Sequence, residues 1–270
     1  MTSSQSPLAT PEAHTIEYLS APMQVRMSNE WFGVAPLKHF WVERRFEAMR
    51  SLAGELISGA SEMAEVGCGH GLLQRQIEDL YGMPVTGFDL NEAALRVNLS
   101  RKSRVCCYDI HQRDVEFREH FDLIFLFDVI EHIPDATGFL QSVAFHLAPN
   151  GKLIVNVPAG QWLFSEYDRA NGHVCRYSYA ELQKVAQSAG FSVTRWTYWG
   201  LPFIPMLVLR KAWLALHKGR ESTVAAGFDS RNDLLNSVFR LLSLCEFLPQ
   251  HLLGTSVLAV LEPQNLAIKS

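Results

Sequence analysis

Hydrophobic residues along the chain fall into short apolar runs separated by stretches with the spacing of a helix. Five of the runs occupy residues 62–66, 83–89, 103–110, 121–129 and 152–157. A stretch before the first run has apolar residues at i, i+4, i+7, i+11 and i+14, namely Val42, Phe46, Met49, Ala53 and Leu56. This stripe predicts an amphipathic helix from Pro36, and the alternation that follows predicts a parallel, doubly wound sheet.

The end of the chain departs from this alternation. Residues 191–196 and 252–261 are predicted strands, and residues 201–250 form a predicted insertion between them. Within the insertion, 201–216 and 234–244 are apolar with helical character, whereas 219–230 is polar and is expected to be mobile. The insertion could pack on the domain as a helical pair, or form a hydrophobic acceptor pocket, a homodimer face or a membrane-surface contact. Residues 201–216 are too short and too charged for a membrane span.

The composition suits one large α/β domain with an insertion. The chain has 270 residues, 48% of them hydrophobic and 19% charged, which allows a substantial core. A net charge of −4 gives no electrostatic reason to expect nucleic acid as a partner. Five cysteines without a C-x-x-C pair indicate reduced thiols and a cytoplasmic protein. The polar first fifteen residues predict a loose tail and no signal peptide.

A glycine turn follows the first apolar run, in the sequence Glu65-Val66-Gly67-Cys68-Gly69-His70-Gly71. Glycines let the main chain fold back sharply and approach a ligand, and the helix that follows offers unpaired N–H groups. The dinucleotide fingerprint G-x-G-x-x-G would need glycine at position 72, which is Leu72, and Glu65 would repel a pyrophosphate. The turn therefore indicates a ligand without phosphates.

Acidic residues stand at the ends of the next three runs. Asp89 ends the second run, where a carboxylate can accept hydrogen bonds from the two hydroxyls of a ribose; the alternative is that it caps the helix beginning near Asn91. Asp109 closes the third run and could bind an adenine amino group or be an ordinary loop residue. The fourth run, apolar as expected of a central strand, ends at Asp128.

These strand ends, with Leu147-Ala148-Pro149-Asn150-Gly151, resemble the class I S-adenosylmethionine (SAM) dependent methyltransferases, in the branch that includes the ubiquinone-biosynthesis O-methyltransferases. The likeness spans about residues 60–200. It implies a Rossmann-like, seven-stranded, mostly parallel sheet whose last strand is antiparallel, with an N-terminal helical cap. The expected division is a tail and cap at 1–35, a SAM-binding core at 36–200, the insertion at 201–250 and a closing strand with tail at 251–270.

The resemblance also implies roles for individual residues. Gly67, Gly69 and Gly71 would pass under the methionine part of SAM, and Glu65 would orient the turn or the amino group of SAM. The remaining expected contacts are Asp89 with the ribose, Leu90 and Ile110 with the two faces of adenine, Asp109 with its amino group, and Phe127 and Asp128 with the methionyl end.

A second cluster, Gly172-His173-Val174-Cys175-Arg176-Tyr177-Ser178, resembles the Gly-His-x-Arg-Arg-Tyr-Ser segment of many bacterial methyltransferases of this type. Cys175 replaces the first arginine, which weakens the case for a paired-arginine clamp on an anion. Ser178 and Glu181 form a predicted capping box. A long loop without periodicity is more often functional than idle.

Two histidines are candidates for a general base that removes the proton of a hydroxyl acceptor: His132, past the fourth run, and His173. A structural role is the alternative for each. No metal-binding constellation is evident, so no metal is expected. On the first helix, the charged residues His39, Glu43, Arg44 and Arg45 predict a solvated face; alternatively, Trp41 or Arg45 covers the cofactor or the acceptor.

The sequence thus predicts a SAM-dependent enzyme that methylates a small-molecule or lipid-linked acceptor, on oxygen. A protein that binds SAM without transferring its methyl group, as a regulatory or assembly partner, is the alternative. A nicotinamide oxidoreductase is disfavoured by Leu72 and Glu65. The expected location is the cytoplasm, including the inner face of the membrane if residues 201–250 contact lipid.

Overall fold

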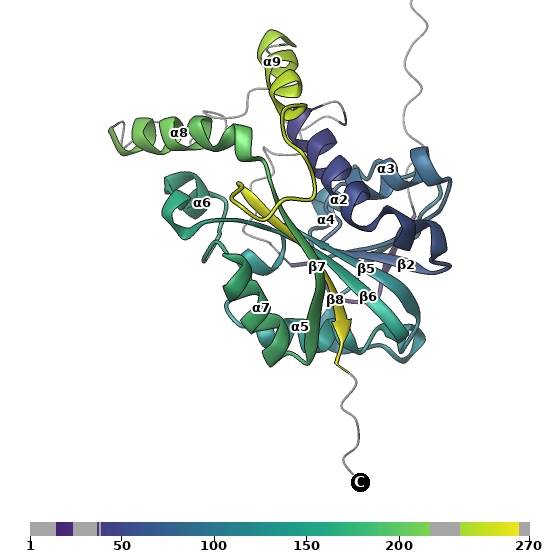
Figure 1. Ribbon diagram of the computed structural model, residues 1–270. Coiled ribbons are helices and arrows are strands. Elements are labelled where there is room, and N and C mark those ends of the chain that lie inside the picture. The colour runs from purple at the N-terminus through teal and green to yellow at the C-terminus, as the bar shows by residue number, and fades with distance from the viewer. Residues whose placement is uncertain (1–14, 24–36, 38, 217–232, 265–270) are drawn as a thin grey trace, which may run out of the picture.

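The computed structural model describes residues 15–23, 37, 39–216 and 233–264 (Figure 1). The predictions for the tail at 1–14, for 24–35 of the cap and for the polar segment 219–230 lie outside the described residues. The strands are β1 Ile16–Tyr18, β2 Met63–Val66, β3 Thr86–Asp89, β4 Val105–Cys107, β5 Phe121–Phe127, β6 Leu147–Pro158, β7 Phe191–Trp199 and β8 Ser256–Pro263. The α-helices are α2 Phe40–Gly59, α3 Leu72–Tyr81, α4 Glu92–Leu95, α5 Ala136–Ala144, α6 Glu166–Ala170, α7 Tyr179–Ser188, α8 Ile204–Leu216 and α9 Asp233–Ser243.

The strands form one sheet in the order β1-β4-β3-β2-β5-β6-β8-β7. Strands β1 to β6 pair in parallel, and β8 is antiparallel to both β6 and β7. The predicted mostly parallel sheet with an antiparallel last strand is therefore confirmed. The sheet of the described residues has eight strands rather than seven, because Ile16–Tyr18 adds to the edge beside β4. Three residues are too few for a readable alternation of apolar and polar positions.

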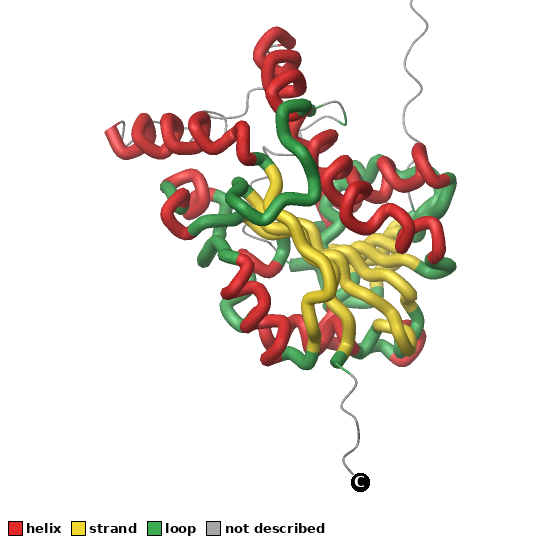
Figure 2. The backbone as a smooth tube through the Cα atoms, in the orientation of Figure 1, coloured by secondary structure: helices red, strands yellow, loops and turns green. Residues whose placement is uncertain are grey.

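Helices cover both faces of the sheet (Figures 1 and 2). Alternate residues of β5 point to opposite faces: Phe125 packs with Met49 and Ile57 of α2, whereas Leu126 packs on the side of Leu140 and Leu182, from α5 and α7. Burial on both faces accounts for the nearly continuous apolar run of this central strand.

The expected solvated face of the first helix is wrong for two of its four residues. His39 and Arg44 are buried, and Arg44 donates to the side chain of Glu246 at 3.2 Å and to its backbone carbonyl at 2.8 Å. The segment around Glu246 and helix α9 cover this part of α2, where Asn236 accepts a hydrogen bond from the backbone N–H of Phe40. This contact joins residues far apart in the sequence, so the local pattern could not reveal it.

The insertion between β7 and β8 forms α8 and α9, which extend beyond the sheet (Figure 1). Its base is anchored, since Phe203 and Leu207 pack with Phe40 and Leu163. The outer surface carries many exposed apolar side chains: Leu209, Trp213 and Leu216 on α8, Leu241 on α9, and Leu244, Phe247 and Leu252 beyond it. Within the described residues, none of the helices combines the length and apolar character that crossing a membrane requires.

Candidate functional site

Two neighbouring cavities open where the parallel strands end, the edge at which open α/β sheets bind ligands. The first, about 200 Å³, we call the aspartate cavity. Its polar wall comes from the last residue of β3 and from the turns after β4 and β5. Its wall residues include Gly67, Asp89, Leu90, Asp109, Ile110 and Asp128. The sequence predicted all six as ligand-binding residues, and the structure brings them to one cavity.

In the glycine turn, the main chain passes close to neighbouring side chains. Gly67 has φ +76°, and a Cβ added there would lie 2.5 Å from the Val129 side chain in the same cavity wall. Gly69 and Gly71 also have positive φ but lie outside the wall; a Cβ on Gly71 would meet Asn98 at 2.4 Å. Gly67 therefore borders the ligand space, and the other two glycines form the turn behind it.

Asp89 joins this turn to the sheet. Its two carboxylate oxygens accept the backbone N–H groups of Gly69 at 2.7 Å and Asn91 at 2.8 Å. Burial raises the pKa of Asp89, and the hydrogen bonds from the backbone oppose that shift. Asn91 itself caps α4 by accepting from Ala94, so the alternative assignment of Asp89 as the helix cap is wrong.

Asp109 and Ile110 lie in a short 3-10 turn after β4 rather than in the strand. The Asp109 carboxylate accepts the backbone N–H of His111 at 2.9 Å, and the Asp109 N–H donates to Ser20 Oγ at 2.8 Å. The segment after the extra strand β1 therefore holds this part of the cavity wall in place.

Besides Gly69 and Gly71, two further predicted cofactor residues, Glu65 and Phe127, lie outside the aspartate cavity wall. Glu65 is buried, and its Oε2 has no hydrogen-bond partner in the described part of the chain. Burial raises the pKa of Glu65 to about 8, although the charge of Arg45 opposes this. The ring of Phe127 packs on the α2 side of the sheet, with the Arg45 guanidinium 5.3 Å from its centre.

Asp128 has a strained backbone, with φ +58°, and such strain is frequently found at functional sites. Its side chain accepts from Asn156 Nδ2 at 2.7 Å and pairs with Arg45 Nη1 at 2.6 Å. Trp199 donates in turn to Asn156 Oδ1. Helix α2 therefore reaches the site through Arg45, a contact that the solvated-face prediction missed.

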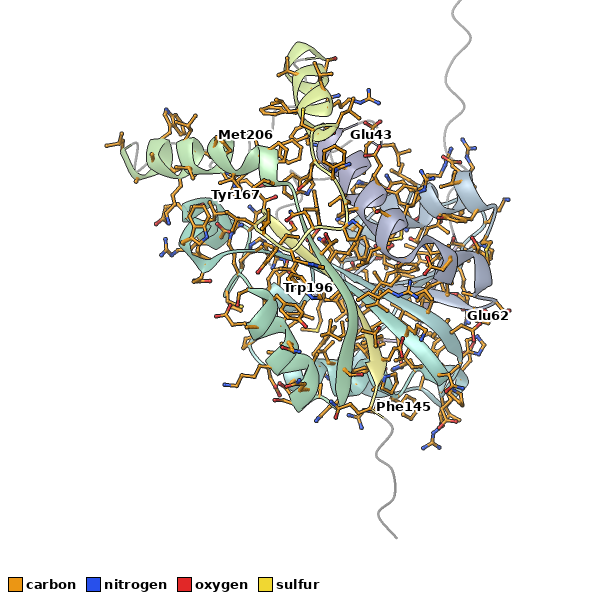
Figure 3. All side chains as sticks on the ribbon, in the orientation of Figure 1. Glu43, Glu62, Phe145, Tyr167, Trp196 and Met206 are labelled. Atoms are coloured by element: carbon orange, nitrogen blue, oxygen red, sulfur yellow. The ribbon has the colours of Figure 1, made fainter. Side chains whose placement is uncertain are left out.

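The second cavity, about 130 Å³, we call the histidine cavity. It shares Asp128 and His132 with the aspartate cavity. Elements remote in sequence complete its wall: Trp41 from α2, Tyr167 from α6, and Leu207 and Arg210 from α8. Figure 3 shows α6 and α8 side by side, marked by Tyr167 and Met206, and the Arg210 guanidinium lies 3.8 Å from the centre of the Tyr167 ring.

The two candidate bases meet in the histidine cavity. The rings of His132 and His173 lie 4.7 Å apart and nearly perpendicular. Burial, assisted by His173, lowers the pKa of His132 to about 4. His173 Nδ1 is 3.1 Å from the buried Asp168 carboxylate, which also accepts from Arg176 at 2.7 Å. Although burial acts to raise it, the hydrogen bonds from His173 and Arg176 hold the pKa of Asp168 below its usual value.

Glu131 is a residue of the site that the sequence did not predict. Its side chain is wholly buried in the wall of the histidine cavity, and neither carboxylate oxygen has a hydrogen-bond partner among the described residues. Burial raises its pKa well above the ordinary value, the charge of Asp128 adds to the shift, and Arg176 and Arg45 oppose it. Glu131, His132 and His173 place possible ligand atoms within 4.8 Å of one another. No such constellation was expected from the sequence.

Comparisons with known proteins agree on one family. A family model described as a methyltransferase domain matches residues 41–195. The chain is 25% identical over 226 residues to the ubiquinone biosynthesis O-methyltransferase of Psychrobacter arcticus, covering 70% of this chain and 86% of that protein. It is 30% identical over 123 residues to the protein of the same name from Bradyrhizobium diazoefficiens, covering 44% of this chain and 47% of that protein. The second match thus spans about half of the relative's length.

The fold is also that of solved methyltransferases. The structure of phosphoethanolamine N-methyltransferase 2 from Haemonchus contortus in complex with S-adenosyl-L-methionine superposes with a TM-score of 0.51 at 20% identity. The match covers 83% of this chain and 53% of the other. At that identity, the likeness concerns the fold alone.

Proposed function

Because this chain belongs to the class I SAM-dependent methyltransferases, we propose that it transfers a methyl group from SAM in the aspartate cavity to an oxygen of a small-molecule acceptor in the histidine cavity. The observation that carries the proposal is the wall common to both cavities, formed by Asp128 and His132. Holding two reactants at a common boundary is the main way in which such an enzyme can accelerate a displacement.

The charge of the aspartate cavity supports SAM as its ligand. Asp89, Asp109 and Asp128 line it, and none of the described wall residues is Lys or Arg, which suits a cationic ligand rather than a phosphate. When bound, SAM supplies a methyl group on a positively charged sulfur: the carbon–sulfur bond breaks, its electron pair stays on sulfur, and the methyl carbon bonds to the acceptor.

In this proposal, each predicted wall residue keeps its implied role. Asp89 accepts hydrogen bonds from the ribose hydroxyls, Leu90 and Ile110 flank the adenine, and Asp109 accepts from its amino group. Asp128, held by Arg45 and Asn156, borders the methionyl end. Residues 36–200 with the closing strand are assigned to the SAM-binding core, and the insertion at 201–250 contributes Leu207 and Arg210 to the wall of the histidine cavity.

The histidine cavity offers means of handling the proton of an acceptor hydroxyl. His132 and His173 lie together in its wall, and Asp168 orients His173. An imidazole beside the acceptor oxygen can take up the proton that oxygen loses. The relatives named as O-methyltransferases also support oxygen as the acceptor atom.

A lipid-linked acceptor is favoured by the apolar surface on α8, α9 and residues 244–253. Leu216, Phe247 and Leu252 are more than 80% exposed, and Leu207 and Arg210 of α8 line the histidine cavity. An acceptor held at a membrane surface could therefore enter beside the insertion. Sedimentation with liposomes, with and without anionic lipid, tests this: absence of binding to both would remove the membrane-associated version.

The first experiment is a calorimetric titration of the chain with SAM and, separately, with NAD. We expect SAM to bind at one site per chain and NAD not to bind; the reverse would refute the family-based function. Incubation with SAM and a cell extract should then release S-adenosylhomocysteine. SAM binding without any release in extracts would favour the alternative of a regulatory or assembly protein.

Replacing His132 or His173 distinguishes SAM binding from methyl transfer. His132→Ala and His173→Ala should each lower the rate of S-adenosylhomocysteine release by about 100-fold, the usual contribution of acid-base groups, while SAM affinity is retained. His120→Ala is the matched control, since this half-exposed histidine lies beside Glu62 and outside both cavities. Unchanged rates in both variants would remove either histidine from the transfer step.

A further inference from the structure

We propose that the methyl acceptor carries an anionic group, a carboxylate or a phosphate, which Arg210 and Arg176 bind on the α6 and α8 side of the histidine cavity. Both arginines line this cavity and are buried, with 8% and 5% of their surface exposed. This acceptor class rests on the proposed function, since it describes the molecule that is methylated. It gives α8 of the insertion a part in selecting the substrate.

Arg210 reaches the cavity from α8, and its guanidinium lies over α6. The guanidinium carbon is 3.8 Å from the centre of the Tyr167 ring, a distance at which a cation is attracted to the ring face. Stacking uses the face of the guanidinium, whereas its N–H donors point outward in the plane of the group. The contact with Tyr167 therefore fixes the plane in which Arg210 donates hydrogen bonds.

Arg176 brings a second guanidinium to the same wall from the segment before α7. Its Nε donates to the Asp168 carboxylate at 2.7 Å, and its Nη1 donates to the backbone carbonyl of Ala159 at 3.3 Å. Asp168 is wholly buried, and the same carboxylate oxygen is also bonded to His173. These contacts hold Arg176 in a fixed position in the cavity wall.

The two guanidinium groups are close enough to repel each other. Burial lowers the pKa of Arg210, Tyr167 opposes this shift, and the charge of Arg176 adds to it. Buried like charges are unfavourable unless negative charge compensates them. An anion bound to both arginines would supply such charge, and the planar fork of a guanidinium matches two oxygens of a carboxylate or a phosphate.

The acidic residues of the cavity wall lie on a different element. Asp128 and Glu131 follow β5, in the turn that forms the boundary with the aspartate cavity, and Asp128 pairs with Arg45 at 2.6 Å. The two arginines instead contact Tyr167 and Asp168 of α6. An acceptor whose anionic group lies on the α6 side is thereby oriented, with its hydroxyl directed to the boundary where the methyl group arrives.

Acceptor analogues that differ in charge test the anion site. Protein saturated with S-adenosylhomocysteine is titrated in a calorimeter with para-hydroxybenzoate, para-hydroxyphenyl phosphate and the neutral para-hydroxybenzamide, whose rings suit the aromatic wall of Trp41 and Tyr167. We expect at least one of the anions to bind at one equivalent per chain. The amide should bind about tenfold more weakly, the value of one charge-assisted hydrogen bond. The tighter of the two anions identifies the group as carboxylate or phosphate.

Replacing Arg210 locates the binding. Arg210→Gln should weaken binding of the preferred anion by about tenfold and leave binding of the amide unchanged, whereas Arg210→Lys, which keeps the charge, should recover part of the affinity. Arg240→Gln is the matched control, because Arg240 lies on α9 of the same insertion, pairs with Glu43 and is outside the cavity wall. Circular dichroism and SAM calorimetry on the same samples report folding and the aspartate cavity.

Three results would overturn the anion site: no binding of either anion, equal binding of the anions and the amide, or an equal loss of anion and amide affinity in Arg210→Gln. SAM binding by the same samples would still support the proposed function. Anion binding that depends on Arg210, in a protein that does not bind SAM, would refute that function and leave the anion site standing.

Discussion

The two cavities share a wall but are assembled in opposite ways. The polar wall of the aspartate cavity comes from the carboxyl ends of β3, β4 and β5, strands of the parallel part of one sheet. The histidine cavity is closed by α2, α6 and α8. Contacts between residues distant in sequence hold these helices in place: Arg45 of α2 pairs with Asp128, 83 residues away at the end of β5, and Arg210 of α8 lies over the Tyr167 ring of α6. Sheet geometry alone brings strand ends together, whereas the helices depend on buried charge pairs and packing. The first cavity should therefore be sensitive to backbone shape, and the second to the removal of a charge.

The largest expected effect is the pH dependence that the buried Glu65 gives to the free energy of unfolding. Burial raises the pKa of Glu65 from 4.5 to about 8, so the folded protein keeps a proton that the unfolded chain loses. The stability tied to that proton is fully present below pH 4.5 and is lost as the pH rises through 8. At about 1.4 kcal/mol per pH unit, the loss amounts to roughly 5 kcal/mol.

Denaturant unfolding of wild type and Glu65→Gln between about pH 5 and 9 measures this cost. The wild-type free energy of unfolding should fall with pH, and the variant should lack that part of the slope. Glu62→Gln, an exposed neighbour, is the control and should behave as wild type. Identical slopes in Glu65→Gln and wild type would show that Glu65 does not carry the shift.

The next effect tests the charge pairs of the histidine cavity. Asp168→Ala removes the partner of both His173 and Arg176 and should lower the free energy of unfolding by about 3 kcal/mol, as expected when a buried ion pair loses one member. SAM affinity at low temperature should stay near wild type. Asp79→Ala, which breaks the exposed pair with Arg75, should cost about 0.5 kcal/mol or less. Loss of SAM binding in Asp168→Ala would mean that the two cavities are not independent.

Backbone shape in the aspartate cavity is tested at the glycine turn. Gly67→Ala combines a positive φ with a Cβ 2.5 Å from Val129, so SAM affinity should fall by about 100-fold, equivalent to roughly 2.7 kcal/mol. Gly82→Ala is matched to it, because Gly82 has φ +72° with no atom within 4 Å of the added Cβ. That variant should lose stability through its backbone yet bind SAM normally. Similar SAM affinities in the two variants would contradict a close approach of ligand at Gly67.

The smallest expected effect is the change in SAM affinity when the Asp89 carboxylate of the aspartate cavity is replaced. Asp89→Asn keeps the shape of the side chain but removes its charge, and should weaken SAM binding by about tenfold, the value of one charge-assisted hydrogen bond. Asp122→Asn is a suitable control, since Asp122 also accepts two backbone N–H groups, from Ser61 and Glu62, but does so away from both cavities. Equal SAM affinity in Asp89→Asn and Asp122→Asn would remove Asp89 from the binding site.

The sequence predicted the aspartate cavity far better than the histidine cavity, for a physical reason. Asp89 and Asp109 stand at the ends of runs whose pattern is local, and a parallel sheet then places those ends side by side. The sequence predicted a solvated face for Arg44 and Arg45, with Arg45 covering the cofactor or the acceptor as the alternative. It could not choose between them, because the groups that pair with these arginines, Glu246 and Asp128, are distant in sequence. The sequence did not single out Glu131, because a carboxylate next to a histidine is not a distinctive motif. Its place in the site is evident only once the loop carrying His173 has folded against it.

The shared wall of Asp128 and His132 is tested most directly by a crystal structure with S-adenosylhomocysteine bound. We predict the adenosine in the aspartate cavity, with the ribose on Asp89 and the adenine against Ile110, and the sulfur beside Asp128 facing the histidine cavity. A ligand lying in the histidine cavity, or a sulfur directed away from Asp128, would contradict the assignment of the two cavities.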